Sequence, residues 1–237
     1  MYGHPADTED GSFRSFGDTL PMPDKDRANP LLLIGGGGHA LVVAEAAALA
    51  GWSVAGFFDD NVSPPLVAGR GDRESAVPRL GPLDRLGAIE DRGWIIAVGD
   101  LRFRRELIGR LRERASAAAT VVHPSAFVSP SADIGRGVYI GPKAVIHSRA
   151  RIGDHAIINS GAIIEHDCLI SDNAHVAPGS VLGGGVSVGA DTLIGLGSRV
   201  LPTIEIGRTC VVGAGAVVVA PVRDGTTVVG VPASPRR

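Results

Sequence analysis

The chain has 237 residues, of which 33 are glycine and only 4% are aromatic, and its formal net charge is −2. That charge excludes the strongly basic surface typical of nucleic-acid binding, and no run of about 18 apolar residues is present to span a membrane. The length suffices for two modest domains, and abundant glycine with few aromatics predicts many tight turns around a core of small aliphatic residues.

The first 29 residues mix acidic side chains with proline and glycine. They lack the basic start and the apolar stretch of a signal peptide, so we expect a mobile extension. Cys168 and Cys210 are the only cysteines, and nothing in the chain marks secretion. A reduced, cytoplasmic setting is therefore expected.

An apolar strand is predicted over Leu31–Ile34, and it leads into four consecutive glycines. An Ala-rich helix over Leu41–Leu49 follows, and then a second strand over Val54–Phe58 that ends in Asp59 and Asp60. A glycine-rich turn between strand and helix, with an acid about 20 residues on, is the arrangement that places a phosphate at a helix N-terminus. The alternative is that the glycines only allow the helix to pack closely on the strand.

A second strand and helix are predicted over Trp94–Val98 and Leu101–Arg114, after a stretch rich in proline and glycine with a short strand or helix near residues 83–88. The whole region is about half the size of a doubly wound dinucleotide-binding fold. It therefore suits a mononucleotide, or the nucleotide part of a nucleotide-linked sugar, better than NAD. We expect a Rossmann-like βαβ domain.

A six-residue repeat occupies the second half of the chain. From Val122 to Val218 in steps of six, all 17 positions are Val, Ile or Leu, and no insertion breaks the register. Neither the period of a strand nor that of a helix explains this spacing. Glycine is frequent just after the aliphatic residue, and small residues, including both cysteines, are frequent two positions before it.

This repeat predicts a parallel β-helix. Each hexad supplies a short strand with one inward aliphatic residue, a small inward residue, and glycine at a corner that needs unusual dihedral angles. Three hexads close a triangular coil, coils stack about 4.8 Å apart, and 17 hexads give between five and six coils. Cys168 and Cys210 fall at inward positions, so we expect packing residues and no reactive thiol.

Among the seven histidines, His166 is distinguished by its neighbours. Asp167 follows it and offers a carboxylate that can fix the tautomer of the imidazole and raise its basicity. One coil later, Gly184 lies over His166, and the missing side chain leaves room for a ligand to pass close to the backbone. His147 and His155, by contrast, fall at outward corners and are expected to be solvated.

Two other interpretations of the histidines are open. One class of hexapeptide-repeat protein holds zinc between subunits with three histidines, but that requires a closely paired set. The spacings of 8, 11 and 9 among residues 147, 155, 166 and 175 do not supply one, so no metal is expected. The second is a non-catalytic scaffold in which His166 is an ordinary surface residue.

Several motifs together resemble one family. They are the glycine turn at 34–39, the acids at 58–60, the Gly-Asp turn at 97–100, the run Ile158–Asp167, and Gly230–Ala233 near the end. In this order the chain, over about residues 31 to 234, resembles the bacterial nucleotide-sugar N-acetyltransferases and the sialic acid O-acetyltransferases of the hexapeptide-repeat acyltransferases. The resemblance implies a left-handed β-helix, a known exception to right-handed parallel crossovers.

The resemblance also implies roles for individual residues. His166 corresponds to the general base, Asp167 and Asn159 to polar residues that orient it, and His175 to a contact with the thioester end of acetyl-CoA. The residues corresponding to backbone segments along the coenzyme are Gly184, Gly230, Val231, Pro232 and Ala233. The residues corresponding to the nucleotide-holding part of the N-terminal domain are Gly37, Gly38, His39, Asp59 and Asp60.

The implied enzyme is a homotrimer that transfers acetyl from acetyl-CoA directly to the amine of a nucleotide-linked amino sugar, with each CoA channel between two β-helices. No metal and no acyl-enzyme is implied. O-acetylation of a sialic acid or related sugar is the nearer alternative, and a scaffold with a nucleotide-sensing domain the more distant one. The expected divisions are an extension (1–29), the Rossmann-like domain (30–118), the β-helix (119–222) and a segment lining the CoA site (223–237).

Overall fold

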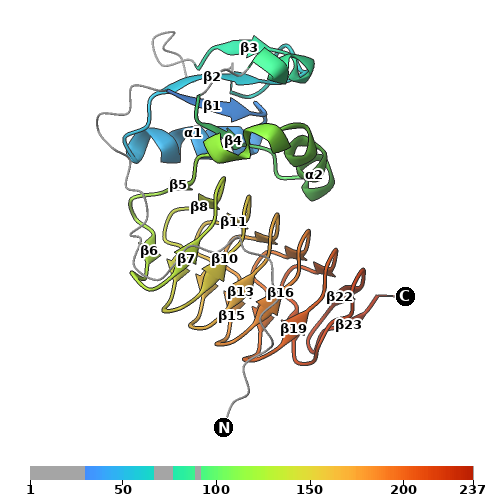
Figure 1. Ribbon diagram of the computed structural model, residues 1–237. Coiled ribbons are helices and arrows are strands. Elements are labelled where there is room, and N and C mark those ends of the chain that lie inside the picture. The colour runs from blue at the N-terminus through green and yellow to red at the C-terminus, as the bar shows by residue number, and fades with distance from the viewer. Residues whose placement is uncertain (1–29, 67–76, 89–91, 237) are drawn as a thin grey trace.

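The computed structural model describes residues 30–66, 77–88 and 92–236, so the predicted extension 1–29 lies outside the described residues. Within that part of the chain, no helix has the length and apolar character needed to cross a membrane. The chain folds into a small α/β domain stacked on the first coils of a long β-helix (Figure 1).

The N-terminal domain is built on a parallel sheet with strand order β3-β2-β1-β4. Its strands are β1 (Leu31–Ile34), β2 (Val54–Phe58), β3 (Arg79–Gly81) and β4 (Trp94–Ile96). Its helices are α1 (Gly38–Leu49), α2 (Leu101–Arg110) and the 3-10 helices η2 (Leu83–Ala88) and η3 (Arg112–Ala117). The predicted Rossmann-like βαβ arrangement is confirmed.

Three predicted boundaries differ from those observed. Helix α1 begins at Gly38, three residues earlier than expected, because the glycine turn itself supplies the extended N-cap residue Gly37. Helix α2 ends at Arg110, and a 3-10 helix follows where the α-helix was expected to continue to Arg114. Strand β4 ends at Ile96 and not at Val98, and the carbonyl groups of Ile96 and Val98 accept hydrogen bonds from the side chain of Arg104.

The β-helix comprises the 17 predicted hexads, each of which forms one two-residue strand that ends on the aliphatic residue. The strands are β5 (Val121–Val122), β6 (Phe127–Val128), β7 (Asp133–Ile134), β8 (Tyr139–Ile140), β9 (Val145–Ile146), β10 (Arg151–Ile152), β11 (Ile157–Ile158), β12 (Ile163–Ile164), β13 (Leu169–Ile170), β14 (His175–Val176), β15 (Val181–Leu182), β16 (Ser187–Val188), β17 (Leu193–Ile194), β18 (Arg199–Val200), β19 (Glu205–Ile206), β20 (Val211–Val212) and β21 (Val217–Val218). Strands β22 (Thr227–Val229) and β23 (Ser234–Pro235) complete it. The predicted left-handed β-helix is confirmed.

The strands form three sheets that are parallel except for the antiparallel pair β22 and β23, because residues 18 apart pair in register through β21. The five-stranded sheet contains β13, the six-stranded sheet contains β12, and the eight-stranded sheet contains β14 and ends with β22 and β23. The inward aliphatic residues form one continuous core in which Cys168 and Cys210 are buried, as predicted. Burial raises the pKa of the Cys168 thiol to about 11, so this thiol is inert at neutral pH.

The expected reason for the repeating glycines was wrong. Glycines directly after the aliphatic residue, such as Gly153 and Gly195, do not have positive φ; a Cβ there would lie within 2.7 Å of atoms of the next coil. The left-handed conformation belongs two residues later, where Gly161, Asp167 and Asn173 all have positive φ. Close stacking of the coils therefore requires glycine directly after the aliphatic residue. The corner dihedral angles favour glycine, asparagine or aspartate two residues later.

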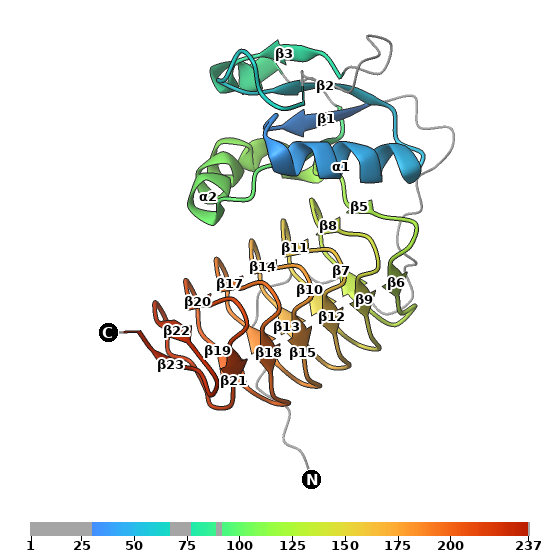
Figure 2. The same cartoon turned by 180° about the vertical axis from the view of Figure 1, so that it is seen from behind.

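Helix α1 lies between the small sheet and the β-helix (Figure 2). Its buried face packs on β1 and β2 above and on Val121, Tyr139 and Ile157 of the eight-stranded sheet below. Helix α2 and η2 cover the other face of the small sheet, where Leu107 of α2 belongs to the same apolar cluster as Trp94 of β4. The two domains therefore share one apolar cluster, and the glycine turn lies at their junction.

Candidate functional site

The four glycines of the turn divide into two pairs. A Cβ on Gly35, whose φ is +109°, would lie 2.6 Å from the side chain of Val98, and one on Gly36 would lie 2.5 Å from the ring of Phe57. Gly35 and Gly36 therefore allow the turn to pack closely against neighbouring side chains, which was the alternative interpretation of the motif. Gly37 and Gly38 face open space at the start of α1, and Gly37, the N-cap residue, provides no side-chain hydrogen bond to the amides of the first turn. Free backbone amides at a helix N-terminus suit an anionic group.

Asp59 and Asp60 lie at the end of β2, beside the glycine turn. A carboxylate oxygen of Asp59 accepts a hydrogen bond from the Gly36 amide at 2.6 Å, and the other accepts from the Asn61 amide at 2.7 Å. Asp60 accepts from the Leu83 amide at 2.8 Å. Both acids therefore shape the loops around the turn, and Asp59 ties the turn to the strand that follows α1.

His39, in the first turn of α1, points toward the β-helix. Its ring meets the edge of Tyr139 with centroids 5.4 Å apart, and its buried Nε2 has no partner in the described structure. Burial, assisted by the positive charge of Arg104, lowers the pKa of His39 to about 4. The imidazole is therefore neutral at physiological pH. It belongs to the junction between the two domains.

His175 and Asn159 form a hydrogen-bonded pair on the eight-stranded sheet. The side-chain amide nitrogen of Asn159 lies 3.1 Å from His175 Nε2, and Asn159 Oδ1 accepts from the Ser160 amide. Burial lowers the pKa of His175 to about 4, and His39 and Arg104 contribute to the shift. Since the amide nitrogen can only donate, Nε2 accepts and the proton of the neutral ring sits on Nδ1.

His166 and Asp167 occupy the corner between β12 and β13, and their contacts define a second cluster. His166 Nδ1 lies 2.7 Å from a carboxylate oxygen of Asp167, and the guanidinium of Arg149 donates to both oxygens of that carboxylate at 2.6 and 2.8 Å. The Arg149 and His166 hydrogen bonds lower the pKa of Asp167 to about 2. The ionised carboxylate holds the proton on Nδ1 and leaves Nε2 of a neutral imidazole as an acceptor.

Arg149 was missed at the level of sequence, although a signal for it existed. It lies 18 residues before Asp167, so it occupies the same left-handed corner position one coil earlier. Residues 18 apart form a column along the β-helix axis, and the column through His166 contains Ser148, whereas the column through Asp167 contains Arg149. Following the column through Asp167 would have identified the arginine.

Gly184 lies over His166 as expected, but the space above its Cα is filled. A Cβ on Gly184 would lie 2.7 Å from Cε1 and Nε2 of the His166 ring. The missing side chain therefore accommodates the imidazole, which occupies the space that had been assigned to a ligand. The side chain of His166 is still 58% exposed, so the ring is open to a partner.

Asn159 was expected to orient His166, and the structure places it elsewhere. Asn159 contacts His175 on the eight-stranded sheet, whereas His166, Asp167 and Arg149 lie at the corner of the six- and five-stranded sheets. Within the described residues no hydrogen bond joins the two clusters. Gly230, Val231, Pro232 and Ala233 connect β22 to β23 at the far end of the β-helix, where the Gly230 carbonyl and the Ala233 amide form hydrogen bonds with Val217 of β21, the last strand of the six-stranded sheet.

His155 is not solvated, contrary to the expectation. It is 6% exposed, and its ring stacks on Trp94 with centroids 5.6 Å apart. The N-terminal domain covers this corner, which a repeat pattern alone does not reveal. Burial, with contributions from Arg104 and Arg105 that outweigh the opposing effect of Asp154, lowers the pKa of His155 to about 4.

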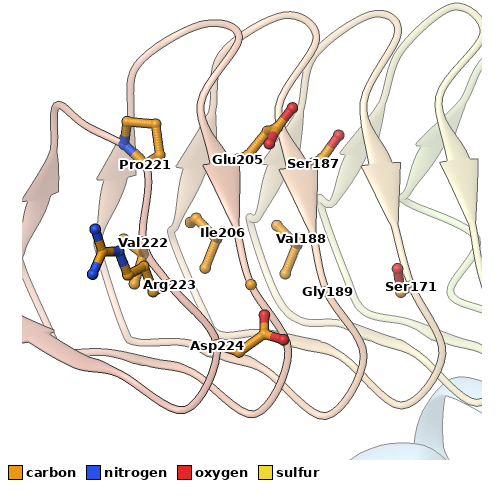
Figure 3. Close-up of a pocket in the computed structure, with 11 residues that line it drawn as sticks. Ser171, Ser187, Val188, Gly189, Glu205, Ile206, Pro221, Val222, Arg223 and Asp224 are labelled. Atoms are coloured by element: carbon orange, nitrogen blue, oxygen red, sulfur yellow. The ribbon is translucent and has the colours of Figure 1, made fainter. Parts of the chain in front are cut away.

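A shallow groove crosses the far coils of the five-stranded sheet (Figure 3). Its polar side chains come from Ser171, Ser187, Glu205, Arg223 and Asp224. None of the predicted site residues lines this groove. The described residues also contain no group of three or more metal-ligating side chains.

Comparisons with known proteins match both halves of the chain. Residues 30–111 match the family model of the PglD N-terminal domain, and residues 149–184 match that of the bacterial transferase hexapeptide, six repeats. The search of curated proteins found no match to this chain.

Solved structures match nearly the whole chain. A histidine-to-asparagine variant of perosamine N-acetyltransferase from Caulobacter crescentus, with CoA and GDP-perosamine, is 36% identical over 89% of this chain and 98% of that chain, with a TM-score of 0.80. The acetyltransferase domain of PglB from Neisseria gonorrhoeae, with acetyl coenzyme A, is 34% identical over 88% and 99%, with a TM-score of 0.78. WeeI from Acinetobacter baumannii is 25% identical over 87% and 99%, with a TM-score of 0.73.

Proposed function

We propose that this chain acetylates the amino group of a nucleotide-linked amino sugar. The chain belongs to the hexapeptide-repeat sugar acetyltransferases and is an acetyl-CoA-dependent acyltransferase, and the proposal proceeds from that membership. The observation that carries the proposal is the His166–Asp167–Arg149 cluster. An exposed imidazole with its proton held on Nδ1 presents a free Nε2 to an incoming nucleophile.

In the proposed reaction the neutral amine of the sugar attacks the thioester carbonyl of acetyl-CoA. The new C–N bond forms, His166 Nε2 takes the proton from the nitrogen, and the C–S bond breaks as the thiolate of CoA leaves. The imidazolium of His166 then gives its proton to the thiolate, which yields the CoA thiol and restores the neutral imidazole. A positioned base of this kind contributes about 10²–10⁴-fold in rate.

His175 is the proposed donor to the oxyanion of the tetrahedral intermediate. Asn159 engages Nε2 and so leaves Nδ1–H as the group available to the substrate. Because burial keeps this ring neutral, it stabilises developing negative charge as a hydrogen-bond donor and does not compete for the proton. Asn159 thus orients His175 in this scheme, and Asp167 orients His166.

Two clusters on different faces of one β-helix require a second protomer to bring them together. We therefore infer a homotrimer in which the His166 corner of one protomer faces the His175 sheet of the next. Gly184 lies at the first cluster, and Gly230–Ala233 lie against β21 of the six-stranded sheet, whose strand β12 leads into that cluster, so we assign both to the coenzyme channel. The two free, buried cysteines support a reducing cytoplasmic setting.

The acceptor's nucleotide is assigned to the open amides of Gly37 and Gly38, with Asp59, Asp60 and His39 beside them. A diphosphate suits those amides, and the acids can accept hydrogen bonds from ribose or sugar hydroxyl groups. The neighbour with GDP-perosamine bound is named an N-acetyltransferase, and this favours an amine over a hydroxyl acceptor.

A thiol-release assay with acetyl-CoA tests the proposal directly. The acceptors are UDP-, GDP- and dTDP-linked amino sugars and free sialic acid, and the product is identified by mass spectrometry before and after mild alkali. We expect thiol release with an amino sugar and an alkali-stable amide. An alkali-labile ester, or release with sialic acid alone, would replace the proposal with O-acetylation, and no release with any acceptor would overturn both.

A further inference from the structure

Arg104 is a fully buried guanidinium at the junction of the two domains. From α2 it donates to the carbonyl groups of Ile96 and Val98 at 2.8 and 2.9 Å, on the N-terminal domain. It also donates to the carbonyl of His155 and, at 3.0 Å, to Asn173 Oδ1, on the β-helix. One side chain therefore joins the end of β4 to two corners of the β-helix.

The β-helix side of this contact is a column of corner residues in three successive coils. His155, Asn173 and Asp191 have φ of 59°, 53° and 60°, so the backbone of each corner residue is in the left-handed conformation. The Asn173 side-chain amide nitrogen also donates to the Leu101 carbonyl at 3.0 Å and to Asp191 at 2.8 Å. The start of α2 is thus attached to the same column as Arg104.

The N-terminal side of the contact reaches the glycine turn. The segment that Arg104 holds, Ile96 to Val98, packs against Gly35, where a Cβ would lie 2.6 Å from Val98 and 3.1 Å from the Ala97 carbonyl oxygen. The turn that begins at Gly35 continues into α1 and ends with His39 against Tyr139 of the β-helix. Moving the 96–98 segment would therefore move the turn.

The chemistry of the contact requires arginine. The groups that accept from the guanidinium are neutral oxygens, and burial lowers the pKa of Arg104 to about 9, so the group remains charged at neutral pH. A planar guanidinium can donate to both domains at once, whereas a lysine ammonium is a point charge with a different geometry. A buried cation is tolerated only when such acceptors surround it.

We propose that Arg104 is a positioning residue that holds the glycine turn in register with the β-helix, so that a nucleotide-linked acceptor bound at the turn presents its amine to the acetyl-transfer residues. The inference rests on the proposed function for the identity of the acceptor. It assigns Arg104 no contact with substrate. Its consequence is that acceptor use, and not acetyl-CoA binding, depends on Arg104.

Kinetics and binding test the first half of this claim, with Arg104→Met, Arg104→Lys and the matched control Arg102→Met on the exposed side of α2. We expect kcat/KM for the acceptor to fall by roughly 10²-fold in Arg104→Met, with partial recovery in Arg104→Lys and no change in Arg102→Met. Acetyl-CoA affinity by calorimetry should stay within about twofold of wild type. Unchanged acceptor kinetics, or an equal loss of acetyl-CoA affinity, would overturn the proposal.

Hydrogen exchange tests the second half without any acceptor. In Arg104→Lys, amides of residues 35–44 should exchange at least about tenfold faster than in wild type, while β14 to β20 keep their protection. Uniform loss of protection would reduce Arg104 to a stabilising residue, and unchanged exchange at the turn would refute the positioning role. Because no acceptor is present, this result stands even where the proposed acceptor class fails.

Discussion

The β-helix and the N-terminal domain hold their functional residues in different ways. In the β-helix, residues 18 apart lie over one another, so Arg149 meets Asp167 and His166 meets Gly184 by register alone. In the N-terminal domain, the glycine turn and Asp59 are brought together by a parallel sheet and by contacts 23 residues apart. A periodic fold can therefore place a cluster of polar side chains at any corner without altering its core.

Removal of an inward residue should destabilise the β-helix most strongly. Ile158 is fully buried in the continuous core, so Ile158→Ala should lower the free energy of unfolding by about 3 kcal/mol through lost burial and a residual cavity. Denaturant titration measures it. Val211→Ala, at a position 38% exposed on the same sheet, is the control and should change stability by less than about 1 kcal/mol. Equal effects would contradict the predicted core.

Acid should weaken the junction between the two regions. His39, His155 and His175 have pKa values near 4 when folded and near 6.5 when unfolded, so the folded state resists their protonation. Stability is therefore unaffected above about pH 6.5 and falls as the pH drops toward 4, by on the order of 3 kcal/mol per histidine. Unfolding at a series of pH values measures this slope.

His155→Asn provides the internal check, because asparagine tolerates the left-handed corner. That variant should show a shallower loss of stability between pH 6.5 and 4 than wild type. His123→Asn, in the first coil, is the control and should keep the wild-type slope, because it replaces an imidazole whose side-chain hydrogen bonds among the described residues are with Ser125. Identical slopes in all three proteins would show that His155 is not protected from protonation.

Two glycines separate coil stacking from corner geometry. A Cβ on Gly195 would lie 2.3 Å from the Val212 carbonyl oxygen, whereas one on Gly197, at φ +67°, meets nothing within 4 Å. Gly195→Ala should therefore cost about 2–3 kcal/mol by overpacking, and Gly197→Ala about 1 kcal/mol from its backbone conformation alone. Thermal unfolding of the pair decides it, and a larger loss for Gly197→Ala would reverse our assignment of the two positions.

A smaller effect is expected at Asp167 and Arg149, which form a cluster with His166, the proposed base. Asp167→Asn keeps the shape but removes the charge that holds the proton on His166 Nδ1, so kcat should fall by about tenfold or more. Arg149→Gln leaves the carboxylate in place and should cost only a few-fold. Steady-state kinetics of both variants gives the order, and an Arg149 effect larger than that of Asp167 would place the arginine in contact with substrate.

Much of the β-helix was predictable because its period is visible in single residues. The inward aliphatic positions, the buried cysteines and the pairing of His166 with Asp167 all follow from local spacing. The role of the glycines did not, because both a tight approach and a positive φ select the same residue type. Arg149 was also within reach, one coil before Asp167.

The junction was not predictable, because it depends on which face of the β-helix the N-terminal domain covers. His155 lies at an outward corner, and it is buried because the N-terminal domain covers that corner and stacks Trp94 on the imidazole. Asn159 and His175 are 16 residues apart, close to one coil, yet their contact depends on side-chain orientation. Arg104 looked like one of several charged residues on α2, and nothing local distinguishes it from its exposed neighbours.

The central claim is that His166 takes the proton from the acceptor amine. The most direct test is the turnover of His166→Asn with both substrates saturating, with His123→Asn as the control and acetyl-CoA affinity measured in parallel. We expect a loss of about 10²–10⁴-fold in kcat with acetyl-CoA affinity nearly unchanged. Turnover within a few-fold of wild type would contradict it and remove His166 from the role of base.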